Sequence, residues 1–141
     1  MDVKELRIGN YVGIEETALH ANGCNHLEAI FEIEEIKKEV AQFKGFHAGE
    51  YYKDLKPIPL TEEWIKKFGF EFQEHESPHG MMLYTNDDWS FCLLEEFGTY
   101  SYAESQGEDY EYFDVMCLRT VHQLQNLHYA LKGEELTLNE I

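Results

Sequence analysis

The stretch KPIPLTEEWIKKFG, from Lys56 to Gly69, divides the chain into two parts. Its two prolines fix their own φ angles and push the residues before them towards extended geometry, which predicts a stiff connector. Thr61 is a favourable N-cap residue, and the two glutamates after it suit the positive end of a helix dipole. Gly69 suits a helix end because glycine adopts positive φ angles at little cost. The stretch therefore predicts an extended connector followed by a short helix that ends at Gly69.

Before the connector, residues 1–56 have the pattern of short strands. Gly9 and Asn10 are turn residues, and the apolar residues that follow them indicate a strand. Phe31 and Ile33 alternate with glutamates, which is the period of a half-buried strand. Two more short strands are predicted within residues 40–46 and 50–55. Several short strands at close spacing suggest a small β-barrel of the SH3-like type.

After the connector, residues 57–141 are predicted to pack as one unit. Five strand-like runs follow the first helix, separated by turn-rich segments: Phe70–Gln73, Met81–Thr85, Trp89–Leu94, Tyr100–Ala103 and Tyr110–Leu118. A second helix follows them. This order predicts an antiparallel meander flanked by two helices, and an α+β fold for the whole chain.

The charge of the chain excludes some partners. The formal net charge of the 141 residues is −17, and between Glu71 and Asp114 there are 12 acidic residues and no Lys or Arg. Such a surface repels nucleic-acid phosphates and anionic lipid, so we expect no direct nucleic-acid binding and no membrane binding. The sequence has neither a long apolar run nor the apolar core of a signal peptide at its start. Cys24, Cys92 and Cys117 are odd in number and far apart, which favours free thiols in the cytoplasm.

Two groups of residues have the composition of a metal site. His75–His79 matches the H-E-x-x-H pattern of zinc proteases, but that chemistry needs a helix and Pro78 would break it. His20, Cys24 and His26 are possible ligands by residue type, yet structural zinc sites use four ligands and no fourth is visible. We therefore expect a hairpin loop and a polar loop, with no metal and no cofactor.

Calcium binding and nucleophilic catalysis have less support. The acidic run Glu104–Glu111 lacks the alternating ligands of an EF-hand loop, which favours a solvated loop. Cys92 and Cys117 lie among large apolar residues, where free cysteines usually serve as small core side chains. A Cys–His enzyme, with His122 or His128 brought near a thiol by the fold, stays a weaker alternative.

The predicted helix Val121–Lys132 carries the candidate contact residues. From Val115 to Gly133 there is no Asp or Glu. At 100° per residue, one face of the helix is an apolar stripe, Val121, Leu124, Leu127 and Leu131, with His128 on its edge. The opposite face carries uncharged polar side chains, which we call the polar strip: His122, Gln125, Asn126 and Tyr129. Thr120 and Gly133 suit the two caps.

The polar strip has two interpretations. It can be the outer face of a packed helix that a neighbouring loop half covers. It can also be an exposed contact for a protein partner or for self-association, because interfaces favour aromatic residues and disfavour Lys and Glu. We take the four residues as the candidate protein contact.

Three stretches carry a resemblance to other sequences: ELRIGNYV near the start, PIPLTEEWIKKFGF at Pro57–Phe70 and VHQLQNLHYALKGEEL at Val121–Leu136. In this order they resemble a family of small uncharacterised proteins from anaerobic gut bacteria and their phages and mobile elements. The resemblance spans most of the chain. It implies a shared fold and a mobile-element context, and it carries over no activity or cofactor.

The preferred hypothesis for function is a cytoplasmic, non-enzymatic interaction module with a protein partner. The alternative is an acidic nucleic-acid mimic that occupies the basic groove of a host DNA-binding protein, since acidic surfaces steer such encounters.

Overall fold

The computed structural model describes residues 3–14, 30–37, 40–45, 49–51, 55–74, 80–106 and 111–138. It divides the chain into two compact units. Unit 1 comprises Met1–Pro59 with Thr120–Glu135, and unit 2 comprises Leu60–Arg119 with Leu136–Ile141. The predicted division at residue 56 therefore lies close to the first boundary, but the C-terminal helix groups with the N-terminal sheet.

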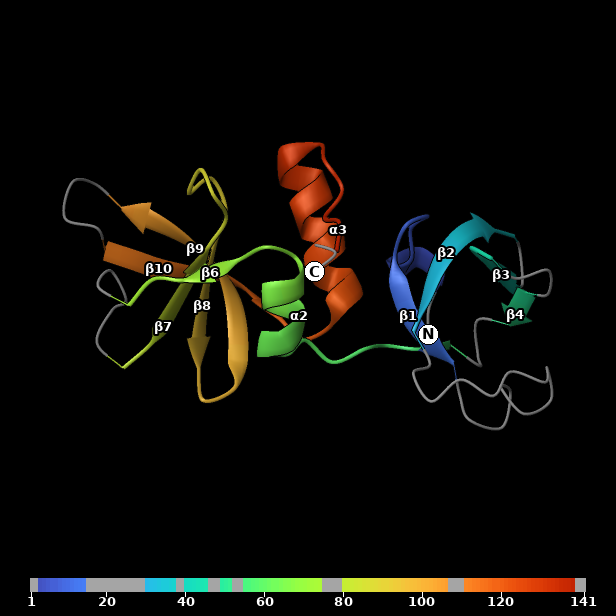
Figure 1. Cartoon of the computed structure of the whole chain (residues 1–141), viewed down its shortest axis with the longest axis horizontal. Coiled ribbons are helices and arrows are strands. Elements are labelled where there is room, and N and C mark those ends of the chain that lie inside the picture. Colours follow the sequence, from blue (N-terminus) through green and yellow to red (C-terminus); the bar gives the residue numbers. More distant parts are fainter. Residues whose placement is uncertain are drawn as a thin grey trace. The chain divides into compact units, whose positions relative to one another are not determined.

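Unit 1 contains a five-stranded antiparallel sheet with the order β4-β3-β2-β1-β5 (Figure 1). Its elements are η1 (Val3–Glu5), β1 (Tyr11–Ile14), β2 (Phe31–Ile36), β3 (Val40–Phe43), β4 (Gly49–Tyr51), β5 (Leu55–Lys56) and α3 (Val121–Lys132). β1 pairs with β2 on one side, Val12 opposite Phe31, and with β5 on the other, Ile14 opposite Leu55. No pairing among the described strands closes this sheet into a barrel, so the structure establishes the sheet but not the predicted closure.

The core of unit 1 follows the predicted alternation of β2. Phe31 and Ile33 are buried, whereas Glu34 is exposed. The Phe31 ring packs against that of Phe43 on β3, with centroids 5.2 Å apart. The remaining buried members of this cluster are Leu6, Val12, Ile14, Ala41 and Leu55. The first half of β2 therefore supplies the centre of the core by alternation. A register shift between Ile33 and Glu35 ends this alternation, so that Glu35 is exposed and Ile36 packs against the core.

Both predicted caps of α3 are present. Thr120 is the N-cap, and its side chain forms a capping box with Gln123. Gly133 ends the helix with a φ of 71°, and its N–H donates to the Tyr129 carbonyl at 2.8 Å. These two ends agree with the prediction from local sequence because capping chemistry is local.

Unit 2 contains a second five-stranded antiparallel sheet with the order β10-β9-β8-β7-β6 (Figure 1). Its elements are α2 (Glu62–Lys67), β6 (Glu71–Phe72), β7 (Met82–Thr85), β8 (Cys92–Glu96), β9 (Thr99–Gln106) and β10 (Glu111–Leu118). Each strand pairs with its neighbour along the chain, which confirms the predicted meander and the α+β class. A register shift between Asp114 and Met116 marks an irregularity in β10.

The sheet of unit 2 is buried on both faces at its centre. Tyr84 and Leu83 are neighbours on β7 that point to opposite faces, and both are buried. Leu83 belongs to a cluster with Cys92, Leu94 and Ala103. Tyr84 lies on the face towards α2, since its side chain hydrogen bonds with Glu62 at the start of that helix. On β8, the neighbours Leu93 and Leu94 are likewise both buried, so both faces of the sheet are apolar at its centre.

Helix α2 begins and ends as its sequence predicts. Thr61 is the N-cap, and its hydroxyl oxygen accepts from the Trp64 N–H at 3.5 Å. Gly69 has a φ of 91°, and the N–H groups of Gly69 and Phe70 donate to carbonyls of the last turn at 2.9 and 3.2 Å. Such paired bonds satisfy carbonyls that a helix end leaves free. The chain thereby enters β6 directly after the helix.

Candidate functional site

Gln125 of the polar strip is fully buried and binds the backbone of unit 1. Its Oε1 accepts from the Tyr11 N–H and its Nε2 donates to the Gly9 carbonyl, each at 2.9 Å. On the same stretch of chain, the Gly9 N–H donates to the Ile33 carbonyl at 2.8 Å and the Asn10 carbonyl accepts from the Ile33 N–H at 2.9 Å. Residues 9–11 are therefore bound on one side by the backbone of β2. On α3 they are bound by the side-chain amide of Gln125.

Asn126 extends this contact to the turn before β1. Its Oδ1 accepts from Asn10 Nδ2 at 2.9 Å and from Arg7 Nε at 3.1 Å, and its Nδ2 donates to the Glu5 carbonyl at 2.7 Å. Asn10 is itself buried, and its Oδ1 accepts from the Arg7 N–H at 2.7 Å. The side-chain amide of Asn126 thus has its hydrogen bonds inside the chain.

Arg7 contacts both α3 and the segment that follows it. Its guanidinium forms an ion pair with Glu135 and donates to the Gln125 carbonyl at 3.2 Å. It also lies over the Tyr129 ring, 4.2 Å from the centroid, where a cation is attracted by the ring's π-electrons. Tyr129 is 43% exposed. It is the exposed member of the polar strip, and one side of its ring is covered by Arg7.

His122 is buried, with 2% of its surface exposed, and neither ring nitrogen has a hydrogen-bond partner in the described part of the chain. Its Nε2 lies 3.7 Å from a carboxylate oxygen of Glu5. Burial lowers the pKa of His122, because a charged imidazole is poorly solvated there, and the Glu5 carboxylate opposes this effect. His122 is therefore a neutral core side chain.

The polar strip thus has its principal contacts inside the chain. The expectation of an exposed strip is wrong for His122 and Gln125, which are buried, and it holds for Tyr129. Residues 5–11 cover the strip, and they lie more than 110 positions away along the chain. The apolar stripe also departs from its prediction at one end, since Leu131 is 50% exposed. Contact with a protein partner through these residues stays a prediction.

The two described cysteines differ in environment. Cys92 is buried, and burial raises the pKa of its thiol, which opposes formation of a nucleophilic thiolate. Cys117 on β10 is exposed. Within the described ranges, no three His, Cys, Asp or Glu side chains are grouped so as to hold a metal ion. The candidate motifs at His75–His79 and at His20, Cys24 and His26 lie outside those ranges.

The β8–β9 hairpin carries a feature that the sequence analysis missed. Phe97 and Gly98 connect the two strands, with φ angles of 51° and 79°. Glu96 pairs with Thr99, so the turn has two residues, both left-handed, as in a type I′ turn. Phe97 is 96% exposed. A Phe-Gly pair between two strand-like runs, where Asn-Gly is usual, is the signal that indicates this site in the sequence.

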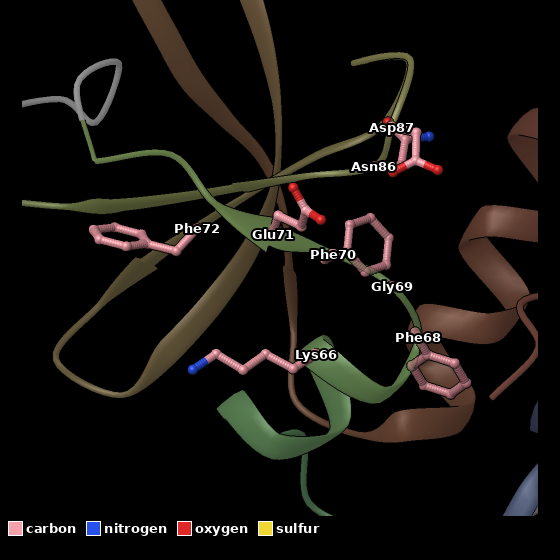
Figure 2. Close-up of a pocket in the computed structure, with 8 residues that line it drawn as sticks. All are labelled: Lys66, Phe68, Gly69, Phe70, Glu71, Phe72, Asn86 and Asp87. Atoms are coloured by element: carbon pink, nitrogen blue, oxygen red, sulfur yellow. The ribbon is translucent and has the colours of Figure 1, made fainter. Parts of the chain in front are cut away.

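Unit 2 also has a cavity of ≈ 500 Å³ along β6 (Figure 2). Five consecutive residues, Phe68–Phe72, line it, and its other lining residues are Lys66, Asn86 and Asp87. The Asn86 side chain is already hydrogen bonded within the turn before β8, since its Nδ2 donates to Ser90 Oγ at 2.9 Å. Lys66 forms an ion pair with Glu62 at 2.7 Å, and Figure 2 shows its side chain pointing away from Asp87. The carboxylates of the lining are the groups left to bind a ligand.

Comparison with known proteins finds no match: no family model, no curated protein and no solved structure is similar to this chain. No helix in the described part of the chain is both long and apolar enough to cross a membrane.

Proposed function

We propose that this protein is a non-enzymatic interaction module and that Phe97 is its principal contact residue. The observation that carries the proposal is a phenylalanine with 96% of its surface exposed, at a left-handed position of a two-residue turn. Backbone strain in a place that folding does not require is a guide to function.

The turn geometry makes Phe97 unfavourable for folding. A left-handed backbone costs a residue with a side chain about 1–2 kcal/mol, and type I′ turns therefore favour Asn, Asp and Gly. The Phe97 side chain also forgoes the roughly 1.5–3 kcal/mol that burial of such a side chain provides. Both costs are offset if the ring enters a pocket of another protein, because a buried aromatic side chain is a typical binding hot spot.

The residues around Phe97 indicate the chemistry of the partner. Glu95 and Glu96 precede it, and Glu95 accepts from the Gly98 N–H at 2.6 Å, which rigidifies the turn. The hairpin lies within the stretch Glu71–Asp114, which has no Lys or Arg. A partner with an apolar pocket rimmed by Lys and Arg complements this surface, and the same charge disfavours a second copy of the chain.

The acidic nucleic-acid mimic is a second candidate, favoured by the same 12 acidic residues. The two proposals differ in what they require. A mimic competes with DNA for its partner and depends on charge spread over the surface, whereas the hairpin contact depends on one aromatic ring. The buried Cys92, with its raised thiol pKa, gives a Cys–His enzyme no support.

Three further expectations belong to this proposal. We propose that the sheet of unit 1 is a partly open SH3-like barrel, supported by a meander β1–β4 whose fifth strand returns to pair with β1. The cytoplasmic location and the mobile-element context implied by the sequence resemblance are likewise proposals.

The test is a pull-down from lysate of a host bacterium at low and at high salt, read by quantitative mass spectrometry. It compares the native chain with Phe97→Asn, which suits the turn, and with Val115→Thr, which removes an exposed apolar side chain elsewhere on unit 2. The proposal expects a basic protein that the native chain and Val115→Thr capture and Phe97→Asn loses. Equal capture by all three proteins contradicts it, and release by added duplex DNA favours the mimic.

A further inference from the structure

The cavity of unit 2 is lined in part by β6, a strand at the edge of its sheet. β6 is the last strand in the order of its sheet, and among the described residues no strand lies beyond it. Both residues of β6, Glu71 and Phe72, line the cavity, together with Asn86 and Asp87 from the segment that follows β7. A strand edge presents unpaired N–H and C=O groups to any chain that lies beside it.

The register of β6 identifies which backbone groups are available. Glu71 lies opposite Thr85 and Phe72 opposite Tyr84, and the Gln73 N–H donates to the Leu83 carbonyl at 2.8 Å. Because hydrogen-bonded and non-hydrogen-bonded pairs alternate in antiparallel sheets, Glu71 and Gln73 point their backbone groups towards β7. The N–H and C=O of Phe72 therefore point outwards, away from β7.

The side chains beside this edge select a cation and an apolar residue. Glu71 and Asp87 are exposed, and neither carboxylate has a hydrogen bond or an ion pair within the described ranges. The charge of Lys66 is balanced by Glu62. Phe72 is 42% exposed, and its ring is held against the Tyr84 ring at a centroid distance of 5.7 Å. Because Glu71 and Phe72 are neighbours on a strand, their side chains point to opposite faces of the sheet. Glu71 suits a Lys or Arg side chain on one face of an added strand, and the Phe72 ring suits an apolar side chain on the other.

We propose that β6 binds an extended, basic peptide segment of a partner protein as an added antiparallel or parallel strand. The main-chain groups of Phe72 hold the peptide backbone, and Glu71 and Asp87 bind its Lys or Arg side chains. Strand addition combines backbone affinity with side-chain selectivity in this manner. β6 would thus be a second contact, besides Phe97, for the basic partner of the interaction module. This inference rests on the proposed function only in taking the ligand to be a protein.

The test uses a fluorescent eight-residue peptide in which Lys and Arg alternate with Val, titrated with the full chain and followed by anisotropy. Phe72→Pro and Phe72→Ala both remove the ring, but only Pro removes the outward N–H, and proline is tolerated where a strand N–H faces outwards. We expect Phe72→Pro to bind at least about tenfold more weakly than Phe72→Ala. Glu71→Gln with Asp87→Asn is expected to weaken binding severalfold and to reduce its salt dependence.

A peptide with the same sequence and N-methyl groups on alternate backbone nitrogens is the matched ligand control. N-methylation in the register that faces β6 is expected to abolish binding, and methylation in the other register to preserve it. Equal binding of both methylated peptides, or of the Pro and Ala variants, overturns strand addition and indicates attraction by net charge alone. Absence of binding to the native chain also overturns it. Phe97→Asn is expected to bind this peptide normally, so the outcome at β6 is independent of the outcome at the hairpin.

Discussion

Replacement of Gln125 by Met tests whether α3 is a structural part of unit 1. Methionine keeps the length and helix propensity of glutamine but forms neither of its two hydrogen bonds. The Tyr11 N–H and the Gly9 carbonyl, whose hydrogen bonds to Gln125 are partly buried, then lose their partner on α3. A buried polar group left unpaired costs about 1–3 kcal/mol. We therefore expect the loss of both hydrogen bonds to lower the unfolding free energy of unit 1 by about 3 kcal/mol.

Amide hydrogen exchange gives the most direct measurement of this loss. Both tryptophans, Trp64 and Trp89, lie in unit 2, so tryptophan fluorescence reports on that unit. The Ile33 amide, which donates to the Asn10 carbonyl and not to Gln125, reports on unit 1. A loss of about 3 kcal/mol corresponds to roughly 100-fold faster exchange of this amide if it exchanges by opening of unit 1.

Leu131→Ala is the matched control on the same helix. Leu131 is half exposed, and a surface substitution of this kind usually changes stability by less than about 0.5 kcal/mol. If Gln125→Met leaves the exchange of the Ile33 amide unchanged while it removes a binding partner, the reasoning fails and the polar strip is a contact surface after all. A large loss of stability with unchanged partner capture confirms α3 as core.

Three other predictions concern single side chains. Phe97→Asn is expected to stabilise unit 2 by roughly 0.5–1 kcal/mol, because Asn adopts the left-handed turn more readily, as measured by urea unfolding with tryptophan fluorescence; a destabilised variant contradicts the turn assignment. The lowered pKa of His122 means that the unfolded chain binds its proton first, so this residue's stabilising contribution is complete above about pH 6.5 and decreases as the pH falls towards the folded-state pKa. The unfolding free energy between pH 7.5 and 5.5 should therefore fall more in the native chain than in His122→Leu, and equal slopes exclude a buried neutral imidazole. In a Cys24→Ser chain, a thiol reagent is expected to modify Cys117 rapidly and Cys92 only on unfolding, since Cys92 is buried and its pKa is raised; equal rates contradict that burial.

Much of the local structure could be predicted from the sequence. The caps at Thr61 and Thr120 and the glycine end of α3 follow from side-chain chemistry within four residues of each helix end. The five strands of unit 2 follow from apolar runs separated by turn residues. The Phe97 turn was missed because its residue types depart from the usual preference at that position.

Which face of α3 is buried depends on the tertiary structure. Its composition is compatible with a buried helix or with an exposed contact, because neutral polar side chains occur in both. The polar side of α3 is covered because Gln125 and Asn126 hydrogen bond with Gly9, Asn10 and Tyr11. These three residues lie more than 110 positions away along the chain. The local periodicity of a helix contains no information about such distant partners. Local sequence therefore specified where the helices and strands form, and long-range hydrogen bonding decided which face of α3 is buried.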